Sequence, residues 1–286
     1  MPITESPLRY PGGKTQLTPL VVQLLEKNSI QRGVYAEPFA GGAGIAWRLL
    51  LRGHVSEVWI NDIDPAIYAF WHCVINDPAQ LCDRIQDTKL SMEEWENQRS
   101  ILMSAESTIQ DLAFSTLFMN RTNRSGILKG GVIGGKNQTG NYKLDCRFNR
   151  DDLIKKIRKI HSYRSSIKLS HLDAEICLKN WESELPSNSL VNIDPPYYLQ
   201  GRDLYLSFYD REDHARLAKL IRTLSLKWML TYDDVPEIED LYSGMPIYRK
   251  GLIYYAQLKR RASELMIFSE GLGIPNSLEP AALATV

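Results

Sequence analysis

Apolar residues recur along the first 70 positions with two different spacings. After Lys14, leucine and valine occupy positions 17, 20, 21, 24 and 25, which is the spacing of one helix face. Short apolar runs at 34–37 and 57–60 predict buried strands, and residues 43–52 between them predict a helix. A strand, a glycine turn, a helix and a second strand in this order are typical of a βαβ unit with parallel strands.

The same α/β pattern returns after residue 167. Strands are predicted at 167–170, 190–193 and 227–231, and a helix at 211–223, with Asp210 and Asp213 placed as a capping box. Residues 246–255 and 264–269 are predicted to form an antiparallel pair at the sheet edge. The prediction is one discontinuous α/β domain (1–71 and 165–270), followed by a flexible tail, 271–286.

The intervening segment, 72–164, has a different composition. It begins with acidic, helical sequence, continues through a glycine-rich loop at 125–140, and then opens a Lys- and Arg-rich helix for which Asn149 is a plausible N-cap. Between 120 and 170 there are 13 basic and 3 acidic residues, a net charge of +10, although the whole chain has 34 of each sign. An ordinary solvated face usually mixes signs, so this bias favours a surface that binds a polyanion.

Composition narrows the class of protein. Hydrophobic residues make up 44% and charged residues 24% of the chain, which favours a globular fold over disorder or a coiled coil. No apolar stretch is long enough to span a membrane. The first residues contain neither a charged region nor an apolar run, so secretion is not expected. The four cysteines have no CxxC spacing, so reduced thiols in a cytoplasmic protein are expected.

Residues 37–44, Glu-Pro-Phe-Ala-Gly-Gly-Ala-Gly, lie between a predicted strand and helix, where nucleotides and their analogues commonly bind. The glycines do not form the G-x-G-x-x-G dinucleotide fingerprint, which disfavours an NAD oxidoreductase. Glu37, at the end of the strand, would repel a pyrophosphate and suits a cationic ligand such as a sulfonium with an amino group. A tight turn without a ligand is the structural alternative.

Two further acids follow the second predicted strand. Asp62 lies about 20 residues after the glycine loop, the distance at which an acid accepts both ribose hydroxyls. Asp64 precedes Pro65 and is interpreted as a helix N-cap with proline at the first helical position. Residues 9–15, Arg-Tyr-Pro-Gly-Gly-Lys-Thr, match only the end of a P-loop, since Leu8 replaces its leading glycine.

Residues 191–198, Val-Asn-Ile-Asp-Pro-Pro-Tyr-Tyr, carry the strongest chemical signal. Asp194 and the carbonyl of Pro195 can both accept hydrogen bonds from one exocyclic amine, and Tyr197 can stack on the ring that bears it. A rigid turn with a surface aromatic would explain the prolines but not the acid, prolines and aromatic together.

This run resembles the D-P-P-Y motif of DNA adenine-N6 methyltransferases. The glycine loop resembles their S-adenosylmethionine motif, residues 9–14 resemble their N-terminal R-Y-P-G-G-K element, and the order of motifs is that of the Dam-like (D12) class. The resemblance implies a Rossmann-like methyltransferase fold, with a seven-stranded mixed sheet and an inserted, mainly helical target-recognition domain, 72–164. The activity implied is that of a site-specific adenine DNA methyltransferase acting on duplex DNA after base flipping.

The resemblance also implies roles for individual residues. Catalysis is assigned to Asp194, Pro195, Pro196 and Tyr197. S-adenosylmethionine contacts are assigned to Tyr10, Gly12, Lys14, Glu37, Pro38, Phe39, Gly41, Gly44, Asp62 and Asp173, although a strand-end cap is the alternative for Asp173. No metal is expected.

Residues 120–126 resemble the N-R-T element that begins the family's DNA-reading hairpin, whereas residues 130–136 depart from the version in GATC methylases. The residues expected to contact DNA are Arg121, Asn123, Arg124, Lys136, Lys155, Lys156 and Lys159. Cytosine-N4 methylation, an RNA substrate and a non-catalytic DNA-binding regulator are the rival interpretations. The target sequence, the oligomeric state and a pairing with a restriction nuclease stay open.

Overall fold

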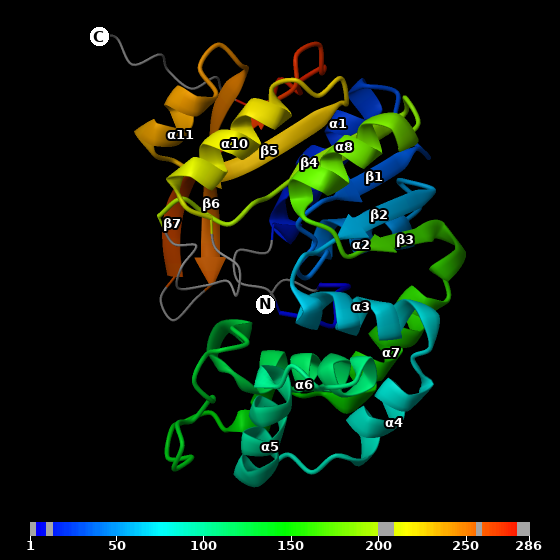
Figure 1. The fold of residues 1–286 in the computed structure, drawn as a ribbon, viewed down its shortest axis with the longest axis vertical. Helices are drawn as coiled ribbons and strands as arrows, with labels where there is room; N and C mark the ends of the chain where they lie inside the picture. The colour runs from blue at the N-terminus through cyan, green and yellow to red at the C-terminus, as the bar shows by residue number, and fades with distance from the viewer. Residues whose placement is uncertain (1–3, 10–13, 200–208, 256–258, 279–286) are drawn as a thin grey trace.

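A computed structural model describes residues 4–9, 14–199, 209–255 and 259–278. Its centre is a seven-stranded sheet in the order β3-β2-β1-β4-β5-β7-β6 (Figure 1). The strands are β1 Val34–Glu37, β2 Glu57–Asn61, β3 Ile167–Ser170, β4 Ser189–Ile193, β5 Trp228–Asp233, β6 Ile247–Tyr255 and β7 Lys259–Phe268. The first five in the order are parallel, and β7 runs antiparallel to both β5 and β6. The predicted mixed sheet with an antiparallel edge pair is confirmed.

Helices cover both faces of this sheet (Figure 1). One side carries α1 Thr18–Lys27, α2 Gly44–Leu51 and α3 Pro65–Asn76, and the other carries α8 Ala174–Glu184, α10 Arg211–Ile221 and α11 Pro236–Leu241. Successive strand residues point to opposite faces, so Tyr35 packs with the first group while Val34 and Ala36 pack with the second. All four residues of β1 are therefore buried.

The α-helices of the inserted segment lie below the sheet in Figure 1. They are α4 Ala79–Asp87, α5 Met92–Met103, α6 Ile109–Thr122 and α7 Arg150–His161. Single-turn 3-10 helices occur at Thr15–Leu17, Arg124–Gly126, Leu144–Arg147 and Arg164–Ser166. A boundary at 71/72 would divide α3, which is continuous from Pro65 to Asn76, and the insertion shares one hydrophobic cluster with the sheet.

The predicted helix starts are confirmed. The Asp64 side chain accepts a hydrogen bond from the amide of Ala66, and Asn149 accepts one from Asp152. Asp210 and Asp213 form a reciprocal capping box at the start of α10. The cysteines are unpaired thiols, as predicted. Among the described residues, no helix is long and apolar enough to cross a membrane.

The prediction of a flexible tail from residue 271 is wrong for its first part. Leu272 and Leu278 are buried against the core. The Asn28 amide donates to the Gly273 carbonyl over 2.9 Å and accepts from the Gly273 amide over 2.7 Å. Residues 271–278 are thus fastened to the end of α1. Residues 279–286 lie outside the described residues.

Candidate active site

Asp194 leaves the carboxyl end of β4, the central strand of the sheet. Every residue of β4 is buried, whereas the Asp194 side chain is 26% exposed, so the carboxylate lies at the boundary between core and surface. Its Oδ1 accepts hydrogen bonds from Lys14 Nζ and from Thr231 Oγ1, each over 2.7 Å. Lys14, which was predicted to contact the cofactor, therefore pairs with the proposed catalytic acid.

Tyr197 and Glu264 complete a cluster around the Lys14 ammonium group. Lys14 Nζ donates to the Tyr197 hydroxyl, which in turn donates to Glu264 Oε1. Lys14 Nζ also lies 3.6 Å from Glu264 Oε1 and 4.7 Å from the centre of the Tyr197 ring. Burial raises the pKa of Glu264 to about 7, although the Lys14 charge opposes this rise.

Sequence reasoning missed Thr231 and Glu264, which come from β5 and β7. The sequence signal that could have identified Glu264 is its position as the only acid in the apolar run from 264 to 268, because charged residues inside a buried strand usually have a partner. The backbone amides of Tyr198 and Leu199 donate to the Asp233 carboxylate over 3.0 and 2.9 Å. Asp233 thereby fixes the turn, in which Pro195 and Pro196 are both buried.

The glycine loop follows β1 and bends sharply. Gly41 and Ala43 both adopt the left-handed region, with φ of 46° and 47°. The Gly41 amide donates to Asp62 Oδ2 over 2.8 Å, and the Asp64 amide donates to Asp62 Oδ1 over 2.9 Å. Asp62 thus orders the loop, and its remaining lone pairs stay available for ribose hydroxyls.

Gly44 begins α2 in close contact with the N-terminal segment. A Cβ at position 44 would lie 2.5 Å from Thr15 Oγ1, so a larger residue here would have to displace the Thr15 side chain. The Pro38 carbonyl accepts a hydrogen bond from Asn61 Nδ2 over 3.0 Å, and the Phe39 ring meets Tyr209 edge to face. The loop is held from several directions before any ligand binds.

Two carboxyl groups at the ends of β1 and β2 are buried and form no ion pair within the described residues. Burial raises the pKa of Glu37 to about 8, against a hydrogen bond from the Tyr35 hydroxyl, and raises that of Asp62 to about 7. When a buried carboxyl group has no cation nearby, its ionised form is destabilised relative to its protonated form. A sulfonium and an ammonium group beside these acids would supply that charge, so the chemistry of these residues fits S-adenosylmethionine.

The remaining predicted cofactor residues have mixed outcomes. Asp173 is the N-cap of α8 and accepts from the amides of Glu175 and Ile176, which is the structural alternative stated above. Tyr10 and Gly12 lie outside the described residues.

Comparison with known sequences decides the family. The D12 class N6 adenine-specific DNA methyltransferase family matches residues 10–255. This chain belongs to that family. S-adenosylmethionine is accordingly the methyl donor, and site-specific methylation of adenine in DNA is the activity.

Two relatives are similar over most of their length. The type II methyltransferase M.MjaIII of Methanocaldococcus jannaschii is 26% identical over 263 residues, covering 84% of this chain and 88% of the relative. The type II methyltransferase M.CviBI of Paramecium bursaria Chlorella virus NC1A is 23% identical over 243 residues, covering 83% and 86%. A solved S-adenosylmethionine-dependent methyltransferase from Agrobacterium tumefaciens aligns with a TM-score of 0.39 and 10% identity, covering 90% of this chain and 62% of that one. That likeness is too low to bear on function.

In this methyltransferase, two residues expected to contact DNA are buried instead. Arg121 is 8% exposed and donates to the Pro7 carbonyl through Nε over 2.7 Å. Asn123 is fully buried, accepts from Trp95 Nε1 over 2.8 Å and donates to the carbonyls of residues 127 and 128. The prediction of DNA contacts by these two side chains is wrong for this structure, because their polar groups are used inside the protein.

Asn120, the first residue of the N-R-T element, also uses its side chain for hydrogen bonds inside the protein. Its Oδ1 accepts from the Arg9 amide over 2.7 Å, while its Nδ2 donates to the carbonyls of Arg9 and Gly126 over 2.7 and 2.9 Å. Arg9 is the first residue of the N-terminal element that ends at Lys14. The insertion therefore holds the segment that supplies the active-site lysine.

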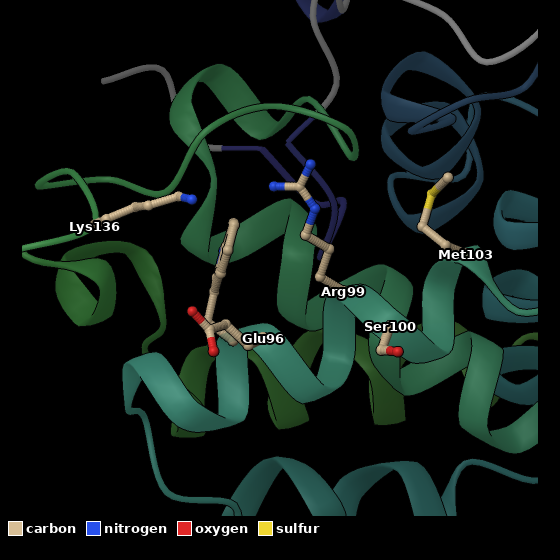
Figure 2. A pocket seen from close by; sticks show the side chains of 6 residues that line it. Glu96, Arg99, Ser100, Met103 and Lys136 are labelled. Carbon is tan, nitrogen blue, oxygen red and sulfur yellow. The ribbon is translucent and has the colours of Figure 1, made fainter.

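Arg124 and Lys136 are exposed on the glycine-rich loop, as expected for DNA contacts. The loop closes through an antiparallel bridge between Asn123 and Val132 and packs on α6. Lys136 and α5 line a shallow cleft of about 400 Å³ (Figure 2). In it, the Arg99 guanidinium lies 5.2 Å from the centre of the buried Trp95 ring.

The three α7 lysines occupy a different surface. Helix α7 packs against α3 and α4 and leads into the amino end of β3, whereas Asp194 lies at the carboxyl end of the parallel strands. Lys156 pairs with Asp152 over 2.8 Å, and Lys159 lies over the Tyr163 ring. Lys155 is exposed. The structure does not bring these lysines together with Arg124 and Lys136.

Proposed function

We propose that this protein methylates N6 of an adenine that is extruded from duplex DNA into the site formed by Asp194 and Tyr197. The observation that carries the proposal is the position of Asp194 at the end of β4. Its carboxylate is held by Lys14 and Thr231, and the buried acids Glu37 and Glu264 are close enough to interact with it electrostatically. An exocyclic amine inside a duplex is paired and stacked, so the enzyme must take the base out of the helix.

The residues that would hold S-adenosylmethionine surround the ends of β1 and β2. Glu37 lies beside the cationic part, Asp62 accepts from the ribose, and the backbone of residues 38–44 forms the wall of the pocket. When bound, the cofactor supplies a methyl group on a positively charged sulfur, which is reactive towards a nitrogen lone pair. Tyr10, Gly12 and Asp173 remain part of this proposal.

Asp194 and Pro195 orient the amine. Both hydrogen bonds that the Asp194 carboxylate accepts from described residues go to Oδ1, which leaves Oδ2 to accept from the adenine amine. The Pro195 carbonyl accepts the second N6 hydrogen, and Tyr197 stacks on the ring. Holding the lone pair in line is the main source of acceleration, because correct orientation removes much of the entropic cost of the encounter.

Replacing Asp194 with Ala tests this assignment. We expect methyl transfer to duplex DNA to fall by about a hundredfold or more, since both the acceptor and the partner of Lys14 are lost. Asp240, an exposed acid on α11, provides the matched control as Asp240→Ala. Activity of Asp194→Ala within a fewfold of the parent would exclude the site.

DNA contacts are proposed for the exposed loop around Arg124 and Lys136, together with Arg99 on α5. Reversing these charges should weaken DNA binding and flatten its dependence on salt, because each phosphate contact releases counterions. The same measurement on a variant with Lys155, Lys156 and Lys159 reversed decides whether α7 also takes part. An unchanged salt slope in the first variant would remove the loop from the interface.

The biological setting is a separate proposal. The two relatives are named type II methyltransferases, so a partnership with a restriction nuclease of the same target sequence is the role to test. Expression in a methylation-free host, followed by sequencing for N6-methyladenine, would give the target. Plasmid DNA from that host would then be challenged with nucleases that cleave the same sequence.

A further inference from the structure

Glu264 is the most buried acid of the active site and has no role in the chemistry described so far. It is 1% exposed and lies on β7 among the buried apolar residues 265–268. Within the described residues its Oε1 contacts Lys14 and Tyr197, but its Oε2 has no hydrogen-bond partner. A carboxyl in such a place is costly, so its position next to the catalytic cluster calls for an explanation.

The charged and titratable groups around Glu264 come from separate parts of the chain: Lys14, Asp194, Tyr197, Asp233 and Lys250. Asp233 and Lys250 lie opposite Glu264 on the neighbouring strands β5 and β6. Residues opposite one another in an antiparallel pair share a face of the sheet. The Asp233 carboxylate accepts hydrogen bonds from the amides of Tyr198 and Leu199. The cation in direct contact with Glu264 is Lys14, whose Nζ lies 3.6 Å from Glu264 Oε1.

We propose that Glu264 is a positioning residue for methyl transfer. It holds Lys14 and Tyr197 while Asp194 binds the adenine amine, and it receives through Lys14 the proton that the amine releases. The proposal rests on the reaction assigned to Asp194 above, and it adds a second carboxyl group to that site.

The distances around Lys14 support an exchange of partners. Lys14 Nζ lies 2.7 Å from Asp194 Oδ1 and 3.6 Å from Glu264 Oε1, so a small rotation of the lysine changes its main partner. Once Asp194 accepts from the amine, it has less negative charge to offer Lys14. Glu264 then keeps the ammonium group paired inside a buried site, where an unpaired charge would be costly.

Tyr197 is held by the same two groups. Its hydroxyl accepts from Lys14 and donates to Glu264, which restricts rotation of the ring that stacks on the base. Fixing an aromatic side chain before the base arrives reduces the entropy lost on binding. Glu264 therefore acts on the base through Tyr197 and on Asp194 through Lys14.

The proton balance also needs an acceptor. The amine carries two hydrogens before methyl transfer and one afterwards, so one proton leaves N6 for Asp194. Asp194 then passes a proton to Lys14 while Lys14 passes one to Glu264, which restores Asp194 and Lys14 to their starting states. The raised pKa of Glu264, about 7, allows it to hold this proton near neutral pH and to release it to water later.

The test replaces Glu264 with Gln, which keeps the shape and most hydrogen bonds but removes the charge. We expect kcat to fall by about tenfold or more, with the KM for DNA and for S-adenosylmethionine within about threefold of the parent. The parent kcat should fall below pH 7 as Glu264 becomes protonated, and this limb of the pH profile should be absent in Glu264→Gln. Carbon-13 NMR of labelled glutamate carboxyls should show a group titrating near pH 7 in the parent that is missing from the variant. The signal of Glu37, whose pKa burial raises to about 8, should be present in both.

Two further variants decide between positioning and general damage to the fold. Glu264→Asp keeps the charge and should recover kcat to within about threefold of the parent, even if the Gln variant proves unstable. Glu270→Gln, an exposed acid just beyond the same strand, should leave kcat and the pH profile unchanged. A folded Glu264→Asp no more active than Glu264→Gln, or a parent without an ionisation near pH 7, would overturn the proposal.

The outcome can be separated from failure of the proposed function. If Asp194→Ala abolishes methylation while Glu264→Gln behaves as the parent, only the role of Glu264 is lost. If Asp194→Ala retains full activity, the site itself is wrong, whatever the Glu264 variants do.

Discussion

Asn120 offers the sharpest test of how the insertion supports the active site. It is 1% exposed, and three backbone groups of the Arg9 and Gly126 residues depend on its side chain. Replacing Asn120 with Asp keeps the size and the acceptor for the Arg9 amide. The new carboxylate cannot donate, so two carbonyls lose their partner and face an oxygen at about the same distance.

The magnitude follows from these lost bonds. Leaving one buried polar group without a partner costs about 1–3 kcal/mol, so two carbonyls correspond to a loss of about 2–6 kcal/mol. A typical domain has only about 5–15 kcal/mol of stability, so the effect should be large. Urea denaturation followed by circular dichroism would measure the free energy of unfolding of Asn120→Asp against the parent.

Activity provides the second part of this test. The Asn120 variant should lose methyl transfer even under conditions in which it remains folded, because Arg9 begins the element that ends at Lys14. Asn141→Asp, an exposed position in the same insertion, serves as the control and should change stability by less than about 0.5 kcal/mol. A loss below about 1 kcal/mol for Asn120→Asp, with weakened DNA binding instead, would refute a structural role and favour the DNA-reading interpretation.

Three other predictions follow from local geometry. Gly126→Ala should lower the free energy of unfolding by more than about 2 kcal/mol in urea denaturation, because φ is +81° and the new Cβ would lie 2.2 Å from the Arg9 carbonyl oxygen. The control Gly135→Ala, at φ +76° with open space around the new Cβ, should lower it by about 1–2 kcal/mol. Equal losses in the two variants would show that the close contact with Arg9 does not matter. The cofactor-free protein should lose stability as pH rises from about 4.5 to 8, because the folded state retains protons on Glu37, Asp62 and Glu264 that the unfolded state releases. Glu37 contributes at most about 1.4 kcal/mol per pH unit to this slope, so Glu37→Gln should make the slope shallower, and an unchanged slope would disprove the assignment. Leu278→Ala should lower stability by about 2–4 kcal/mol and increase hydrogen exchange at residues 271–278, whereas no change would support the loose tail that composition predicts.

Much of the fold was predictable because its signals are local. The helical spacing after Lys14, the short strands and the caps at Asp64, Asn149 and Asp210 depend on neighbours within a few residues. The Asp194–Tyr197 run was identified for the same reason, since its chemistry is contained in four consecutive residues. The domain boundary was less predictable, because α3 crosses it and belongs to both parts.

The failures concern residues whose partners are distant in the chain. Arg121 and Asn123 are residue types that commonly contact DNA, yet their hydrogen bonds go to Pro7, Trp95 and the loop after Asn123. A charge count cannot distinguish a guanidinium that binds phosphate from one that holds a backbone carbonyl. The same limitation applies to the tail, where the Gly273 amide donates a hydrogen bond to Asn28, which is 245 positions away in the sequence.

The sequence by itself determined the order of the motifs, the mixed α/β pattern and the chemistry of the acid, prolines and tyrosine that accept an amine. Only the tertiary structure decided that Lys14 pairs with Asp194, that Thr231 and Glu264 join them, and that Asn120 fastens the N-terminal segment. The physical reason is that secondary structure depends on spacing along the chain, whereas a buried charge or amide is defined by the groups that surround it in space.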